Sequence, residues 1–300
     1  MFKVIAAAAL LCLGALGAQA QEWRKLLTPQ ELHALLQETD ARVIDLRVAE
    51  GADSYALGHI PGSVNAPYAT WRGPKENPGA VLSDAVLTER LQSAGVEADA
   101  PVVLVYWGAD QSDFGAAARV YWTLKSSGIS QIAILNGGFK AWREAGLPVD
   151  AAPTVPARSA ITAKLSPQWL ATREQVQAIV EGRSEAVLVD ARPDAFFRAE
   201  KKHDAAKAAG TLSGAVSLVF DRWFTPESPL MSAPAPALER ARALAAEANG
   251  KPIVSFCNTG HWAAINWFAL SELAGVPDVK LYPESMVGWT SADLPVKPGA

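Results

Sequence analysis

The sequence predicts an α/β protein made of two copies of one domain, each a parallel β-sheet with helices on both faces. Short apolar runs alternate with segments of helical spacing, which is typical of a parallel sheet covered on both faces. Matching motifs recur in the same order, and the offset between them stays between 145 and 152 residues. The length of 300 residues, 50% of them hydrophobic, is sufficient for about two domain cores.

Five pairs of matching segments define the repeat. In chain order, residues 43–47 match 188–192, 59–64 match 211–216, 71–74 match 222–226, 101–105 match 252–256, and 136–142 match 283–289. The first pair is an apolar run that ends in Asp-x-Arg, and each segment of the last pair precedes a Leu-Pro-Val sequence. We therefore predict a first domain over residues 21–150, a linker rich in Pro and small residues over 151–164, and a second domain over 165–300.

Each copy has its own expected strands and helices. Short apolar runs predict buried strands over residues 43–46, 102–106, 187–189 and 253–256. Helical spacing of apolar residues predicts helices over residues 85–94, 237–248 and 263–274.

The first 20 residues have the pattern of a cleavable signal peptide. Lys3 gives a positive start, an uncharged run extends from Val4 to Ala18, and Ala18-Gln19-Ala20 supplies the small residues of a cleavage site. The run is shorter than the 18 or so residues that span a bilayer, so we expect no stable membrane insertion after cleavage. We expect a periplasmic protein, with a retained N-terminal anchor as the alternative.

The composition excludes several classes of protein. The formal net charge is −4 and no block of Lys or Arg stands out, which argues against a nucleic-acid binder. The chain has only four His, and its His and carboxylate residues show no metal-ligand spacing. We therefore expect neither a metal ion nor an organic cofactor.

Cys257 is the main candidate for chemistry. The chain has two Cys, and the other, Cys12, lies in the predicted signal peptide, so no internal disulfide is expected. Cys257 follows a predicted strand, at the sheet edge where open α/β sheets bind ligands. Gly260 lets the loop curl so that successive N–H groups can face the sulfur, and the following helix adds its positive end, which favours the thiolate. An inert buried Cys is the alternative.

These motifs together resemble the rhodanese family. The resemblance rests on the strand–Cys-x-x-Gly–helix segment, the Asp-x-Arg strand ends, the turns at Gly62 and Gly214, and the final Gly-x-x-x-Trp, and it extends from about residue 26 to residue 296. The sequence is similar to the two-domain sulfurtransferases, in which only the C-terminal copy carries the active Cys. Tyr106 stands in the place of Cys257, and about four extra residues around 109–112 lengthen that loop, so the resemblance implies an inactive first domain.

The resemblance implies a double-displacement sulfur transfer. Cys257 would take the outer sulfur of a small anionic donor as a persulfide and pass it to a thiophilic acceptor, either cyanide or a thiol. We expect thiosulfate as the donor, with 3-mercaptopyruvate as the alternative. A non-catalytic periplasmic sulfur carrier or docking module is the other hypothesis, and a periplasmic acceptor protein is a further candidate partner.

The candidate site is the segment 257–263 with nearby charged residues. Besides Cys257, the residues expected to bind substrate or shape the loop are Asn258, Thr259, Gly260, His261, Trp262 and Ala263. The family often has an Arg four positions after the Asp-x-Arg arginine. This chain has Phe196 there, and we expect Arg198 or Lys201 to substitute. Asp190 and Arg192 are expected to brace the loop.

Two related chemistries are disfavoured by the same segment. A phosphatase of the related cell-cycle type needs an Arg six positions after the Cys, and this chain has Ala263 there. A disulfide oxidoreductase needs a second Cys. The roles of two loop residues stay open, because His261 either contacts the donor or lines the rim, and Trp262 either walls the sulfur pocket or packs in the core.

Overall fold

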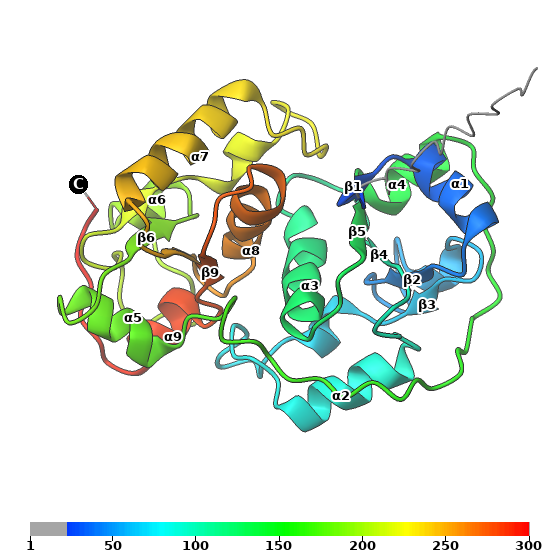
Figure 1. Ribbon diagram of the computed structural model, residues 1–300, viewed down its shortest axis with the longest axis horizontal. Coiled ribbons are helices and arrows are strands. Elements are labelled where there is room, and N and C mark those ends of the chain that lie inside the picture. The colour runs from blue at the N-terminus through cyan, green and yellow to red at the C-terminus, as the bar shows by residue number, and fades with distance from the viewer. Residues whose placement is uncertain (1–22, 300) are drawn as a thin grey trace, which may run out of the picture.

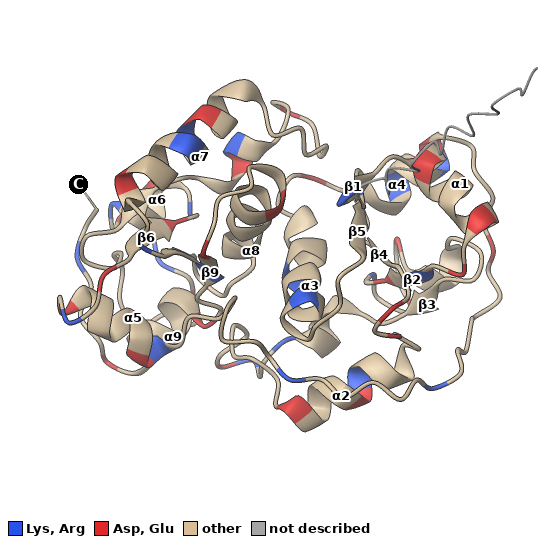
Figure 2. Cartoon of the chain, viewed as in Figure 1, with Lys and Arg blue, Asp and Glu red and all other residues tan. Residues whose placement is uncertain are grey.

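The computed structural model describes residues 23–299 as two α/β domains that lie side by side (Figure 1). The predicted signal peptide, residues 1–20, lies outside the described residues. No helix in the described range is long and apolar enough to cross a membrane. Acidic and basic positions are distributed over both domains (Figure 2).

The first domain is built on a five-stranded sheet. Its elements, in order, are β1 (Leu26–Leu27), α1 (Pro29–Glu38), β2 (Arg42–Asp45), η1 (Tyr55–Leu57), β3 (Val64–Asn65), η2 (Tyr68–Trp71), α2 (Asp84–Ser93), β4 (Val102–Val105), α3 (Phe114–Ser126), β5 (Ile132–Leu135) and α4 (Gly138–Glu144). The strand order is β1-β5-β4-β2-β3, and every pairing is parallel. All four residues of β4 and of β5 are buried, as expected for strands covered on both faces.

The second domain repeats this plan with four strands. Its elements are α5 (Arg173–Val180), β6 (Val187–Asp190), α6 (Asp194–Phe197), β7 (Val216–Ser217), η3 (Phe220–Trp223), α7 (Ala235–Ala248), β8 (Ile253–Phe256), α8 (Trp262–Phe268), η4 (Ala269–Leu273), β9 (Val279–Leu281) and α9 (Ser285–Ser291). The parallel strand order is β7-β6-β8-β9. The predicted fold class is confirmed.

Strand register in the second domain fixes where the site forms. Asp190 at the end of β6 lies opposite Phe256 at the end of β8. Because the two strands are parallel, the Asp-x-Arg segment and Cys257 emerge at the same edge of the sheet. The helix that follows Cys257 has about the predicted extent but changes geometry along its length. The α-helix ends at Phe268, and a wider turn over η4 completes the segment, with Ala274 N–H donating to the Ala269 carbonyl.

The two domains share one hydrophobic core at their junction. Helices α3 and α8 lie side by side between the two sheets (Figure 1). The ring of Tyr121 on α3 meets that of Phe268 edge to face at 4.9 Å, and Phe114 also packs on Phe268 at 5.6 Å. Glu272 accepts a hydrogen bond from Tyr121 at 2.9 Å and pairs with Lys125 at 2.6 Å. The junction therefore buries both apolar surface and charge.

An isolated second domain is expected to be unstable. A fragment from about residue 160 to 300 would expose the face of α8 that packs on α3. It would also leave the buried carboxylate of Glu272 without Tyr121 and Lys125. Each large side chain exposed in this way costs about 1.5–3 kcal/mol. We expect the fragment to aggregate or to unfold at markedly lower urea concentration than the full chain. A soluble fragment with full activity would contradict the shared core.

Candidate active site

Cys257 directly follows β8 and is 1% exposed. Its backbone N–H donates to Oγ of Ser285 at 3.0 Å, and its carbonyl accepts from Met286 N–H at 3.0 Å. Ser285 begins α9 with a φ of +51°, a left-handed conformation that is uncommon for residues other than glycine. The first turn of α9 thus holds the backbone of Cys257 in place.

The catalytic loop, defined here as residues 257–263, has N–H groups with no protein acceptor. Within residues 23–299, the N–H groups of residues 258–263 donate to no backbone or side-chain acceptor. Gly260 makes the curl with a φ of +72°, and a Cβ there would lie 2.4 Å from both Nη1 of Arg119 and the carbonyl oxygen of Pro283. A curled run of free N–H groups favours an anion.

Arg192 and Asp190 support this loop from the second domain. The guanidinium of Arg192 makes a fork with the carboxylate of Asp190, at 2.9 Å from Nε and 2.6 Å from Nη2. Nη2 also donates to the Gly210 carbonyl at 2.8 Å, and Nη1 reaches Oδ1 of Asn258 at 3.3 Å. These contacts connect the Asp190–Arg192 pair to Asn258 in the catalytic loop, a position that suits the predicted bracing role.

The other side of the loop is covered by the first domain. Nη2 of Arg72 donates to the Thr259 carbonyl at 2.7 Å, and Nη1 donates to the hydroxyl of Tyr68. The Tyr68 hydroxyl lies 3.0 Å from Nδ1 of His261. The site is therefore composite, with Cys257 on one domain and a polar wall on the other.

Hydrogen bonds fix the tautomer of His261. Nε2 lies 2.8 Å from the Ser112 carbonyl, and because a carbonyl only accepts, Nε2 carries the proton. Nδ1 then accepts from Tyr68. Burial lowers the pKa of His261 to about 4, and the charge of Arg72 contributes to this effect, so the ring is neutral at neutral pH.

Trp262 is held by the same first-domain loop. Its indole N–H donates to Oγ of Ser112 at 2.7 Å, and its ring stacks on Phe220 with centroids 5.0 Å apart. The extra residues of the first domain, 109–112, therefore end against the catalytic loop of the second.

Arg119, on α3, is the most unusual charge near the loop. It is 1% exposed, and its guanidinium carbon lies 5.1 Å from the centroid of the Trp122 ring. Nη2 donates to the Gly79 carbonyl at 3.0 Å, whereas Nε and Nη1 have no hydrogen-bond partner among the described residues. Burial and, to a smaller degree, the charge of Arg72 lower the pKa of Arg119 to about 9, so it is still protonated at neutral pH. Helix α3 carries basic positions along the domain junction (Figure 2).

Comparison with known proteins agrees with this fold. Residues 28–145 and 172–292 each match the family described as "Rhodanese-like domain". The chain belongs to the rhodanese family. The two matched ranges make it a tandem rhodanese-like protein.

Curated relatives carry two kinds of sulfurtransferase name. The chain is 32% identical over 302 residues to a "Probable 3-mercaptopyruvate sulfurtransferase" of Pseudomonas aeruginosa, which covers 92% of this chain and 98% of the relative. It is 32% identical over 235 residues to a "Thiosulfate sulfurtransferase" of Gallus gallus, covering 77% and 78%. A "Putative thiosulfate sulfurtransferase" of Synechococcus elongatus is 28% identical over 292 residues, covering 94% and 88%.

A solved structure shares the fold at low identity. The anaerobic ergothioneine biosynthesis enzyme from Chlorobium limicola superimposes with a TM-score of 0.75 at 20% identity, covering 92% of this chain and 70% of that one. This likeness concerns the tandem architecture alone.

The two basic residues expected to substitute for the missing Arg lie away from the loop of this rhodanese-like protein. Arg198 is 54% exposed in its side chain and pairs with Glu200 at 3.0 Å and with Asp194 at 3.8 Å. Lys201 is also exposed. Within residues 23–299, neither makes a hydrogen bond or ion pair with the catalytic loop. The arginines that reach the loop are Arg72, Arg119 and Arg192.

The first rhodanese-like domain carries its own anion in the equivalent loop. Gly108 and Ala109 donate their N–H groups to Oδ2 of Asp113, at 2.7 and 3.1 Å. Tyr106, in the place of Cys257, accepts from Gly137 N–H at 3.2 Å. An internal carboxylate thus occupies N–H groups in this copy, whereas those of the catalytic loop have no acceptor among the described residues.

Acid is expected to loosen the contact made by His261. The unfolded chain binds a proton near the ordinary His value of 6.5, whereas folded His261 does so only near pH 4. The unfolded state therefore holds more protons between these values, and folding stability should fall as pH drops from about 6.5 to about 4. Urea unfolding across this range should show a smaller loss for His261→Gln than for wild type. A His203→Gln control with the same reduction would contradict this assignment.

Proposed function

We propose that this protein is a sulfurtransferase that moves a sulfane sulfur from thiosulfate to cyanide or a thiol through a persulfide on Cys257. The observation that carries the proposal is the catalytic loop, where Cys257 begins a curl of N–H groups that have no acceptor within residues 23–299. The guanidinium groups of Arg72 and Arg119 border that curl. Family membership and the names of the relatives support the same reaction class.

The reaction balances without any oxidant. The Cys257 thiolate attacks the outer sulfur of thiosulfate, a new S–S bond forms at Sγ, and the old S–S bond breaks with its electron pair leaving on sulfite. The persulfide then gives its outer sulfur to cyanide as thiocyanate and regenerates the thiolate. Negative charge stays on sulfur or sulfite throughout, so N–H groups and guanidinium groups that are already in place stabilise each step.

The donor assignment favours thiosulfate over 3-mercaptopyruvate. The signal-peptide pattern of residues 1–20 supports export to the periplasm, which we propose as the location, and sulfur oxyanions reach that compartment directly. Mercaptopyruvate belongs to cytoplasmic amino-acid breakdown. The P. aeruginosa relative keeps mercaptopyruvate as the second candidate donor.

A donor panel tests this assignment. The purified protein is assayed with thiosulfate, 3-mercaptopyruvate and glutathione persulfide, each with cyanide as acceptor, and kcat/KM is compared. We expect the highest kcat/KM with thiosulfate. A clear preference for mercaptopyruvate would overturn the donor assignment and leave the Cys257 chemistry standing, whereas inactivity with all three donors would favour the carrier hypothesis.

A further inference from the structure

We propose that Arg119 of the non-catalytic domain binds the charged end of the sulfur donor, as the anion-binding residue that the catalytic domain lacks. The ligand class is a sulfur oxyanion, with its sulfonate at the Arg119 guanidinium and its outer sulfur toward Cys257. The inference rests on the proposed sulfur transfer and adds to it a specificity-determining residue.

Arg119 is a buried charge whose hydrogen bonds are incomplete. Buried donors in proteins almost always have acceptors, and a buried charge is normally paired. Arg119 is 1% exposed, yet within residues 23–299 its Nε and Nη1 have no hydrogen-bond partner. Its guanidinium carbon lies 5.1 Å from the centroid of the Trp122 ring, but no carboxylate of the described residues forms an ion pair with it. A bound anion would supply both missing acceptors and the missing charge.

The free donors of Arg119 lie beside the catalytic loop. Nη1 of Arg119 lies against Gly260, because a Cβ on that glycine would be only 2.4 Å away. The unpartnered guanidinium is therefore beside the same loop whose N–H groups are free, and an anion held there would be adjacent to the nucleophile.

Within residues 23–299, the one arginine of the second domain that reaches the loop, Arg192, is already paired with Asp190 at 2.6 Å. Phe196, four positions after Arg192, is apolar, and its ring packs on Trp262 with centroids 6.1 Å apart. Arg198 is engaged by carboxylates at the surface. Arg72 is already committed to the Thr259 carbonyl and to Tyr68, which makes it a positioning residue for the loop.

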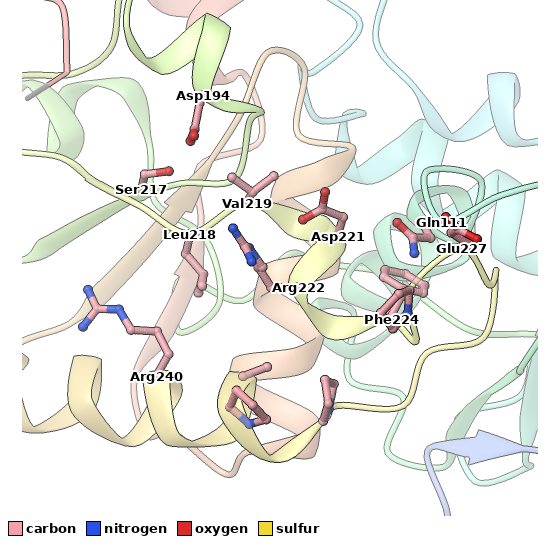
Figure 3. A pocket seen from close by; sticks show the side chains of 14 residues that line it. Gln111, Asp194, Ser217, Leu218, Val219, Asp221, Arg222, Phe224, Glu227 and Arg240 are labelled. Carbon is pink, nitrogen blue, oxygen red and sulfur yellow. The ribbon is translucent and has the colours of Figure 1, made fainter.

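A nearby cavity has basic residues, but it fits this role less well. It has a volume of about 860 Å³ and lies between η3 and α7, and Cys257 is not among its lining residues (Figure 3). Arg222 and Arg240 line it together with three carboxylates, those of Asp194, Asp221 and Glu227. Such a mixed lining has no net preference for an anion, so these arginines serve as controls.

The chemistry gives Arg119 its largest effect when the donor's S–S bond breaks. The electron pair of that bond leaves on sulfite, so charge builds up at the oxyanion end of the donor. A guanidinium fork in a buried site matches an oxyanion better than an ammonium does. Loss of Arg119 should therefore weaken both donor binding and the first transfer step.

Binding is measured without turnover in the Cys257→Ser background. Calorimetric titration of thiosulfate into Cys257→Ser is compared with Cys257→Ser/Arg119→Met and with the matched control Cys257→Ser/Arg222→Met. We expect Arg119→Met to raise the Kd about ten- to hundredfold, the range for loss of a charge-assisted hydrogen bond, and Arg222→Met to leave it unchanged. Equal Kd values for Cys257→Ser with and without Arg119→Met would overturn the proposal.

Two further outcomes keep the inference separate from the proposed function. If Cys257→Ser binds thiosulfate in an Arg119-dependent way while wild type shows no turnover, the anion site stands and the sulfurtransferase proposal fails. If Arg119→Met does not fold, as judged by circular dichroism, Arg119→Lys takes its place. Lysine keeps the charge but loses the fork, so we expect the Kd to rise about fivefold, and no change would overturn the proposal equally.

Discussion

Replacing Cys257 with serine is expected to lower kcat/KM for sulfur transfer from thiosulfate to cyanide by at least about a thousandfold. A serine hydroxyl is not ionised near neutral pH and cannot store a sulfane sulfur, so both half-reactions stop. The substitution replaces one small atom at a 1% exposed position and leaves the backbone contacts to Ser285 and Met286 available.

The control for Cys257→Ser is a measurement of its folded state. Thermal unfolding and circular dichroism of Cys257→Ser should match those of wild type, which separates lost chemistry from lost structure. Activity within about tenfold of wild type would show that another group carries the sulfur and would refute the assignment of Cys257 as the nucleophile.

Gly260→Ala is expected to cause the second largest loss, about a hundredfold or more in kcat/KM. The glycine has a φ of +72°, and an added Cβ would meet Nη1 of Arg119 and the Pro283 carbonyl at 2.4 Å each. The carbonyl is backbone and cannot rotate away, so the loop must shift. A shift there displaces the free N–H groups and Arg119 at the same time.

Gly182→Ala is a matched control for the backbone cost. Gly182 has the same φ of +72°, but a Cβ there would meet nothing within 4 Å. Both variants should lose about 1–2 kcal/mol of stability from the left-handed conformation, and only Gly260→Ala should lose activity. Equal activity in the two variants would contradict the role of the loop curl.

Much of the fold could be predicted from the sequence because the matching motifs are short, local segments that recur in the same order in both halves. Residues 253–256 form β8 as expected, and the register with β6 places Arg192 beside the loop that the Asp-x-Arg motif suggested. The helix predicted over residues 263–274 has about the predicted extent, but its α-helical turns end at Phe268 and a π-helical turn continues it to Leu273. A widened turn preserves the same buried face, and apolar spacing alone does not distinguish the two.

The first-domain half of the site could not be predicted in the same way. Arg72 and Tyr68 reach the catalytic loop from nearly 190 positions earlier in the chain, and no local motif encodes a contact across a domain junction. The selection of Arg198 relied on nearness in sequence, whereas its surface carboxylates hold it elsewhere. One signal was present for Arg119, a single charge within the apolar stretch that becomes the buried part of α3. An isolated buried charge of this kind is a functional candidate.

The central claim is tested most directly by the intact mass of the protein after incubation with thiosulfate. The account predicts a gain of one sulfur atom on wild type, its loss when cyanide is added with thiocyanate appearing in equal amount, and no gain in Cys257→Ser. An unchanged mass in wild type, or a gain that persists in Cys257→Ser, would contradict a persulfide on Cys257.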